Sequence, residues 1–250
     1  MNSSILEVTG LEKHFGGVHV TCNIDFAMQE GEQSAIIGPN GAGKSTFINL
    51  LTGYHRPDAG KVVFAGEEIT GLPPHMVARR GISRAFQVSS VFARMTVGEN
   101  VRAAVHAQMR ATFRLFVPAR SLGVEETARV LALCGLESKR DLMAGELAQG
   151  DKKRLELAIA LAARPRLLFL DEPTAGMSIE EARSTMALVD RLNRELKLTV
   201  LFTEHDMGIV FNHARRLTLL HRGEIIVQGT PAEVRANETA QKVYLGEHQL

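Results

Sequence analysis

A glycine-rich stretch, GPNGAGKST at Gly38 to Thr46, follows a short apolar run, QSAII, and leads into the helix formers FINLL. The spacing G-x-x-x-x-G-K-[ST], with a buried strand before it and a helix after it, is typical of a phosphate-binding loop. Glycines let the backbone turn so that successive N–H groups point at an anion, and the helix adds the positive end of its dipole. The stretch therefore predicts a strand, loop and helix of an α/β fold around a nucleoside triphosphate site.

The side chains of this loop have separate expected roles. Lys44 can reach the β- and γ-phosphates, and the Ser45 hydroxyl is placed to bind Mg²⁺. A chance glycine-rich turn is the alternative, and the strand and helix on either side argue against it. The residues assigned to nucleotide binding are Gly38, Pro39, Asn40, Gly41, Ala42, Gly43, Lys44, Ser45 and Thr46.

A second apolar run, LLFLDE, ends in the carboxylates of Asp171 and Glu172. The carboxyl end of a parallel strand opens onto the ligand crevice, so Asp171 can hold Mg²⁺ through water. Glu172 points elsewhere and can take a proton from an attacking water. A solvated acidic turn before Pro173 is the alternative. Two adjacent carboxylates favour hydrolysis over nucleotide storage, because binding Mg²⁺ needs only one.

Strand and helix patterns alternate on both sides of a helical middle that runs from Gln87 to Arg164. This order predicts a mostly parallel sheet with an inserted helical subdomain. Apolar residues at every second position from Val18 to Met28 predict a half-buried strand near the N-terminus. In the segment GELAQGDKKRLELAIALAARP a face formed by Leu155, Ala158, Ile159 and Ala162 predicts a helix. Gly150, at its start, has an N-terminal cap as its simplest explanation.

Composition limits the class of protein. The 250 residues carry 29 basic and 28 acidic side chains, without the basic stripe that nucleic-acid binding requires. No apolar run reaches the ~18 residues of a membrane span, and the chain starts without a signal-peptide core, so we expect a cytoplasmic location. Cys22 and Cys134 lie in apolar patterns and are expected to be reduced core residues. The nine histidines form no H-E-x-x-H motif or Cys/His cluster.

Taken in order, the motifs resemble an ATP-binding cassette (ABC) ATPase over almost the whole chain. The resemblance covers the phosphate loop, Gln87 in RAFQ, LAQGD, LLFLDEP, AGMS and His205 in FTEHD. It implies a P-loop NTPase fold over residues 5–250, with an antiparallel β-subdomain at the N-terminus and a helical subdomain at about 88–164. ATP and Mg²⁺ are the implied ligands.

The resemblance also implies roles for single residues. Gln87 would contact Mg²⁺ and the attacking water, beside the surface that docks membrane subunits. His205 would reach the γ-phosphate and help to position Glu172; taken alone, it reads as a packed structural histidine. Phe15, in LEKHFGG, would stack on adenine. A core phenylalanine is the alternative for that position.

LAQGD occupies the place of the family's signature, usually written LSGGQ, which caps the ATP bound by the other subunit of a head-to-tail dimer. Gly150, where backbone N–H groups must approach phosphate, is present. Ala148 removes a hydroxyl whose hydrogen bond to a charged group is worth ~1.5–3 kcal/mol. Asp151 places negative charge near an anion, and the basic run Lys152 to Arg154 can offset it. Ser178 stands where relatives often have aspartate or asparagine.

Two segments, DEPTAGM and the C-terminal tail at about 228–250, look like those of ATPases from branched-chain amino acid importers. An ordinary amphipathic terminal helix is the alternative for the tail. The implied partners are an identical or paralogous ATPase, two membrane permeases and, indirectly, a periplasmic solute-binding protein, at the cytoplasmic face of the inner membrane. Related ABC systems for urea, aromatic acids or lipopolysaccharide export, and a non-transport ABC regulator, remain alternatives. A small-molecule kinase would leave Gln87, LAQGD and His205 unexplained.

Overall fold

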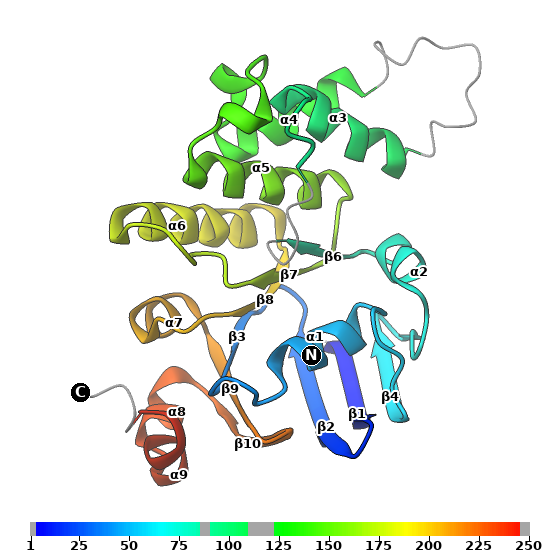
Figure 1. The fold of residues 1–250 in the computed structure, drawn as a ribbon, viewed down its shortest axis with the longest axis vertical. Coiled ribbons are helices and arrows are strands. Elements are labelled where there is room, and N and C mark those ends of the chain that lie inside the picture. The colour runs from blue at the N-terminus through cyan, green and yellow to red at the C-terminus, as the bar shows by residue number, and fades with distance from the viewer. Residues whose placement is uncertain (1–3, 86–90, 110–122, 246–250) are drawn as a thin grey trace.

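Two β-sheets and a layer of helices form the computed structural model, which describes residues 4–85, 91–109 and 123–245 (Figure 1). The first sheet is antiparallel, with the strand order β2-β1-β4-β5. Its strands are β1 (Ser4–Phe15), β2 (Val18–Gln29), β4 (Ala59–Phe64) and β5 (Glu67–Glu68). The antiparallel sheet expected at the N-terminus is therefore present.

The second sheet has the order β10-β9-β3-β8-β7-β6 and is parallel except for β10, which pairs antiparallel with β9. The strands are β3 (Gln33–Ile37), β6 (Ile82–Ala85), β7 (Leu167–Asp171), β8 (Thr199–Thr203), β9 (Arg216–His221) and β10 (Glu224–Gly229). Strands β3 and β8 are buried along their whole length, because helices cover one face of this sheet, and α1 with the first sheet covers the other. This confirms the mostly parallel sheet.

The register of this sheet aligns the strand ends that carry polar residues. Ile36 of β3 pairs with Thr203 of β8, and Thr203 pairs with Asp171 of β7. The loop after β3, the acidic pair at the end of β7 and the residues after β8 therefore lie at one edge of the sheet. This is the edge at which ligands bind in open parallel sheets.

The helices of the described residues fall into two groups. Those that flank the sheets are α1 (Lys44–Leu51), α2 (Pro74–Arg79), α6 (Ile179–Leu196), α7 (Met207–His213), α8 (Pro231–Ala236) and α9 (Glu238–Ala240), followed by a π-helical turn at Gln241–Leu245. The helical layer holds α3 (Val97–Gln108), α4 (Val124–Cys134) and α5 (Gln149–Ala162), with 3₁₀ turns at Glu137–Lys139 and Ala144–Glu146. Among the described residues, no helix combines the length and apolarity needed to cross a membrane.

Helix α5 lies between α3 and α4 on one side and α6 and β6 on the other (Figure 1). The predicted apolar face packs in the core, but Leu157 and Leu161, outside that face, are also buried. The sequence pattern pointed to one buried face because it could not reveal that neighbours cover the helix on two sides. Capping boxes begin α3 at Thr96 and α6 at Ser178.

The two faces of the parallel sheet belong to different hydrophobic cores. Leu168 and Leu170 of β7 face the core shared with the helical layer, whereas Phe169 faces the core shared with α1 and the first sheet. This division follows from the two-residue period of a strand. Helix α1, which follows the phosphate loop, buries Phe47 and Ile48 in the second of these cores.

The alternation predicted for β2 holds only in part. Ile24, Phe26 and Met28 are buried, but Val18 is exposed and Thr21 is buried instead. A bulge causes the change: Asn23 has a φ of 48°, and the register with β1 shifts at this point.

The cysteine prediction is corrected for one of the two residues. Both cysteines are free, but only Cys134 lies in the core. Cys22 is half-buried beside the β9–β10 turn, where its N–H donates to the Gly223 carbonyl across 2.8 Å. The bulge in β2 shifts Cys22 out of the buried face. Arg222 and Gly223 form that turn, which connects the antiparallel strands β9 and β10.

Candidate nucleotide site

The glycine-rich loop is held close to the strands behind it. A Cβ atom on Gly38 would lie 2.0 Å from the Leu220 carbonyl oxygen, and one on Gly43 would lie 2.7 Å from that of Val20. Gly43 also has a φ of 104°, a conformation that side chains disfavour. The close packing of the backbone therefore requires glycine at both positions.

Helix α1 begins directly after Gly43 without a side-chain cap and without an acidic residue in its first turn. Within the described part of the chain, no acceptor pairs with the backbone N–H groups of Lys44, Ser45 and Thr46. Unpaired N–H groups and the helix dipole together favour a bound anion.

The Lys44 ammonium group lies inside the loop. Its Nζ donates to the carbonyl oxygens of Gly38 at 2.5 Å and Pro39 at 3.1 Å. Burial lowers the pKa of Lys44, while the nearby carboxylates of Glu172 and Asp171 act to raise it. The loop and the acidic pair therefore meet in space, although more than 120 residues separate them in the sequence.

Asp171 is held on both of its carboxylate oxygens. Its Oδ2 accepts from Arg84 Nη2 at 2.8 Å, and its Oδ1 accepts from Thr203 Oγ1 at 2.7 Å. Arg84 also donates to Asn49 Oδ1 at 2.6 Å, so the guanidinium bridges α1 and β7. Burial lowers the pKa of Arg84, and the hydrogen bond to Asp171 opposes that change.

Glu172 has a φ of 49°, which is uncommon for a residue with a side chain. Its N–H donates to the backbone oxygen of Thr203 at 3.1 Å and to its hydroxyl at 3.2 Å. In this conformation the Glu172 carboxylate contacts His205, whose Nε2 lies 3.0 Å from Glu172 Oε1. His205 is 40% exposed, so it is not a packed core histidine.

Glu204, between Thr203 and His205, forms hydrogen bonds that hold this part of the site together. The Glu204 carboxylate is buried and accepts from the N–H and hydroxyl of Thr174, at 2.7 and 2.5 Å. Its second oxygen accepts from the His205 N–H at 3.2 Å. Glu204 thereby ties the turn after Glu172 to the end of β8.

The residues present fit a magnesium ion. The Ser45 hydroxyl is exposed and has no hydrogen-bond partner among the described residues. The Asp171 carboxylate is already oriented, and each of its oxygens retains a lone pair beyond the one that it uses. Hydroxyl and carboxylate oxygens are the ligands that Mg²⁺ takes from proteins.

Phe15 ends β1 and is 43% exposed, so it is not a core phenylalanine. The ring makes an edge contact with His55, with centroids 5.2 Å apart, and Lys13 Nζ lies 5.5 Å from its centroid. Such an exposed ring is available for stacking, and the contact with adenine stays a prediction. Gln87 lies outside the described residues.

The signature-like segment lies apart from the loop of its own chain. Ala148 is the N-cap of α5 and makes no side-chain cap bond. A Cβ atom on Gly150 would lie 3.4 Å from Glu181 Oε1 of α6. Helix α5 belongs to the helical layer, whereas α1 packs in the other core (Figure 1). The structure of a single chain therefore does not bring Ala148 and Gly150 to the phosphate loop.

The charge of Asp151 is offset by Lys139, which forms an ion pair with it. The basic residues next to Asp151 have other partners: Lys153 faces Glu156, and Arg154 donates to the Ser184 hydroxyl. Residues one and two positions after Asp151, Lys152 and Lys153, point to other faces of α5. Arg154, three positions on, could reach Asp151 but bonds to Ser184 of α6 instead.

Sequence reasoning missed three residues of this site, Arg84, Thr203 and Glu204. A charged residue in the apolar strand ISRAF was the available signal for Arg84. For Thr203 and Glu204 the signal was their position at a strand end, next to His205.

This chain is similar to known proteins over nearly its whole length. A family model described as ABC transporter matches residues 21–175, and one described as branched-chain amino acid ATP-binding cassette transporter matches residues 224–249. The branched-chain amino acid transport ATP-binding protein BraF of Pseudomonas aeruginosa is 38% identical, over 99% of this chain and 100% of its own length. Its counterpart LivG of Escherichia coli K12 is 35% identical with the same coverage.

Two further proteins are similar over nearly the full chain. The lipopolysaccharide export system ATP-binding protein LptB of Haemophilus influenzae is 34% identical over 98% of each chain. An ATP-binding cassette of an ABC transporter, solved in its ADP conformation, superposes with a TM-score of 0.86 at 30% identity. The match covers 98% of this chain and 99% of that one.

Proposed function

This chain belongs to the ABC transporter family of ATP-binding proteins, and on that premise we propose that it is the ATP-hydrolysing subunit of a branched-chain amino acid importer. It would form a single nucleotide-binding domain over residues 5–250. Its part in transport is to couple ATP binding and hydrolysis to movement of membrane subunits.

The proposal of branched-chain amino acids as the solute class depends on the C-terminal segment. It matches the branched-chain family model over residues 224–249. In the structure this segment packs against the domain: Val234 and Ala240 are buried in the main core, and the Arg235 guanidinium lies 5.6 Å from the Phe211 ring centroid. These contacts make the tail part of the domain core, which argues against the alternative of an ordinary amphipathic terminal helix.

The residues around the loop would have separate roles in ATP hydrolysis. The N–H groups at the start of α1 and the Lys44 ammonium bind phosphate oxygens. Ser45 and Asp171 would hold Mg²⁺, with Gln87 as a further ligand. Bound Mg²⁺ neutralises charge on the phosphates. Glu172 accepts the proton of the attacking water, and His205 holds the Glu172 carboxylate in place.

Two identical or paralogous ATPases would complete the site. Each chain supplies its loop to one ATP and its Ala148–Gly150 segment to the other, because neither chain brings both together. Phe15 would stack on the adenine. The dimer would lie on the cytoplasmic face of the inner membrane, bound to two permeases that receive solute from a periplasmic binding protein.

Lipopolysaccharide export is the second candidate, and the 34% identity to LptB favours it. The tail segment argues for the importer, since it matches the branched-chain model.

The test is isolation of the assembly that contains this chain from membranes of its native host, followed by identification of the membrane subunits. Reconstituted in liposomes with its binding protein, the complex should take up labelled leucine, isoleucine or valine only when ATP is supplied. The matched control is a complex carrying Lys44→Ala. Export permeases in the purified complex, or uptake that continues with Lys44→Ala, would overturn the proposal.

A further inference from the structure

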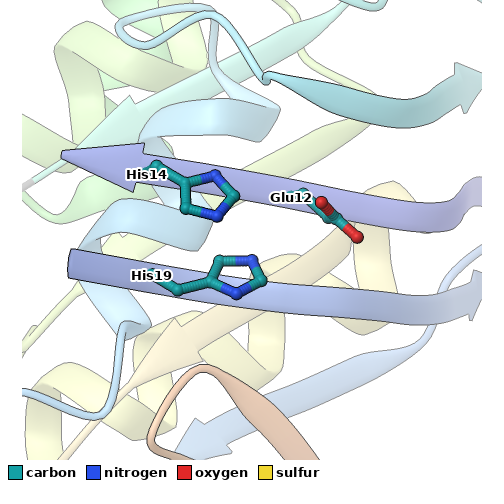
Figure 2. A group of neighbouring side chains, drawn as sticks. All are labelled: Glu12, His14 and His19. Atoms are coloured by element: carbon teal, nitrogen blue, oxygen red, sulfur yellow. The ribbon is translucent and has the colours of Figure 1, made fainter. Parts of the chain in front are cut away.

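Three side chains with metal-binding atoms gather on one face of the β1–β2 hairpin (Figure 2). Figure 2 shows Glu12 and His14 of β1 and His19 of β2 projecting from the same face of the two strands. Each offers one ligand atom, and these atoms all lie within 4.8 Å of one another. The nucleotide chemistry uses none of the three.

The hairpin register brings the two histidines together. His14 pairs directly with His19 across the strands, and their rings stack with centroids 3.9 Å apart. The His14 N–H donates to Asp58 Oδ2 at 2.6 Å instead of to the facing strand. The pair is therefore of the non-hydrogen-bonded kind, in which facing side chains come closest. Glu12, two residues before His14, shares its face.

Asp58 orients the His14 ring so that one of its nitrogens is available to a metal ion. His14 Nδ1 lies 3.3 Å from Asp58 Oδ2, and Nδ1 must be the donor because a carboxylate only accepts. This leaves the lone pair of His14 on Nε2. Lys13 Nζ holds the other oxygen of Asp58 at 2.7 Å. A carboxylate behind a histidine in this way fixes its tautomer and raises its basicity as a ligand.

The remaining two ligand groups are not otherwise engaged. Within the described chain, no hydrogen bond or ion pair involves the Glu12 carboxylate or the His19 ring, and the His19 ring stacks on that of His14. His19 is exposed, so rotation about its side-chain bonds can bring its nitrogen, with Nε2 of His14, to the 2.0–2.1 Å from the ion that zinc requires.

We propose that Glu12, His14 and His19 form a zinc-binding site on the β1–β2 hairpin, with Asp58 as the group that orients His14. Two imidazoles and one carboxylate suit Zn²⁺, whereas Mg²⁺ prefers oxygen ligands. The bound ion would cross-link β1 to β2 one residue before Phe15. The proposal is independent of ATP hydrolysis and of the transported solute.

The test uses tag-free full-length protein without nucleotide, titrated with Zn²⁺ against a chromophoric chelator. We expect one equivalent of Zn²⁺ at this site, and a loss of affinity greater than tenfold in His14→Ala and in His19→Ala. Asp58→Asn should weaken binding by ~10- to 100-fold, as for other groups behind a metal ligand. His75→Ala, which removes an exposed histidine of α2, is the matched control and should bind as the parent does.

Two further measurements keep the result interpretable. Saturating Zn²⁺ should raise the Tm of the parent but not that of His19→Ala, because a ligand of the native state stabilises it. Circular dichroism and ATP binding should be unchanged in His19→Ala, which shows that the variant folds. Zinc binding that survives both histidine substitutions, or the absence of a saturable site in the parent, would overturn the proposal.

Discussion

The guanidinium group of Arg84 lies 2.8 Å from the carboxylate of Asp171, and both side chains are nearly buried, at 8% and 14% exposed. Arg84 reaches this position from β6, which pairs with β7 in parallel. The second contact of Arg84, with Asn49 on α1, connects the phosphate-loop helix to the strand that carries Asp171. Arg84 is thus a positioning residue that orients Asp171.

Loss of this pair should destabilise the fold. Removing one partner of a buried ion pair leaves the other charge without compensation and costs about 3–5 kcal/mol. We therefore expect Arg84→Met to lower the free energy of unfolding in urea by that amount, with Arg79→Met, an exposed position on α2, as the control. In the Arg84→Met background, Asp171→Asn should cost less than in the parent. Additive effects of the two substitutions would contradict the coupling.

Glu172→Gln should keep ATP binding and lose hydrolysis by ~10²–10⁴-fold, the usual contribution of a general base. With ATP and Mg²⁺ the variant should double its mass in analytical ultracentrifugation, because the ATP that closes the dimer is no longer consumed. Glu180→Gln, on the exposed start of α6, should hydrolyse ATP normally. Equal rates of ATP hydrolysis in Glu172→Gln and the parent would show that Glu172 is not the general base. A persistent monomer would show that the signature needs a paralogue or a permease.

Ala148→Ser should stabilise the protein. Ala148 is the N-cap of α5 with φ −60° and ψ 159°, and a serine there can accept from an N–H of the first turn. The gain is about 1 kcal/mol, which corresponds to ~2–4 °C in Tm for a chain of this size. Ala187→Ser, at an exposed position within α6, should not raise the Tm. Equal shifts in the two variants would argue against a capping effect.

Glu126→Gln should cost stability at neutral pH but not in strong acid. Hydrogen bonds from Arg129 and Arg164 lower the pKa of Glu126 from 4.5 to about 2. A lowered carboxyl pKa stabilises the native state above the unfolded value, and this stabilisation is lost as the pH falls from about 4.5 to about 2. Urea unfolding of parent and variant should therefore differ at pH 7 and converge toward pH 2.

The matched control for this prediction is Glu125→Gln, which alters the exposed neighbouring residue of α4. A difference between Glu126→Gln and the parent that stays constant from pH 7 to pH 2 would show that the carboxylate charge is not responsible.

Much of the site could be predicted because its signals are local in the chain. The loop at Gly38 to Thr46 needs a strand before it and a helix after it, and the acidic pair needs only the end of a strand. The capping boxes at Thr96 and Ser178 were also predictable, because each joins residues three apart. Where the pattern was wrong, at Cys22, a bulge had shifted the alternation by one residue.

The sequence by itself determined the phosphate loop, the acidic strand end and the family, since each depends on residue types at fixed spacing within one segment. Only the tertiary structure decided which groups surround them. Sheet order placed Arg84 of β6 beside Asp171, and hairpin register placed His19 opposite His14. Packing of the helical layer gave Asp151 its partner in Lys139. Register and packing arise from burial summed over many residues, and no short pattern encodes that sum.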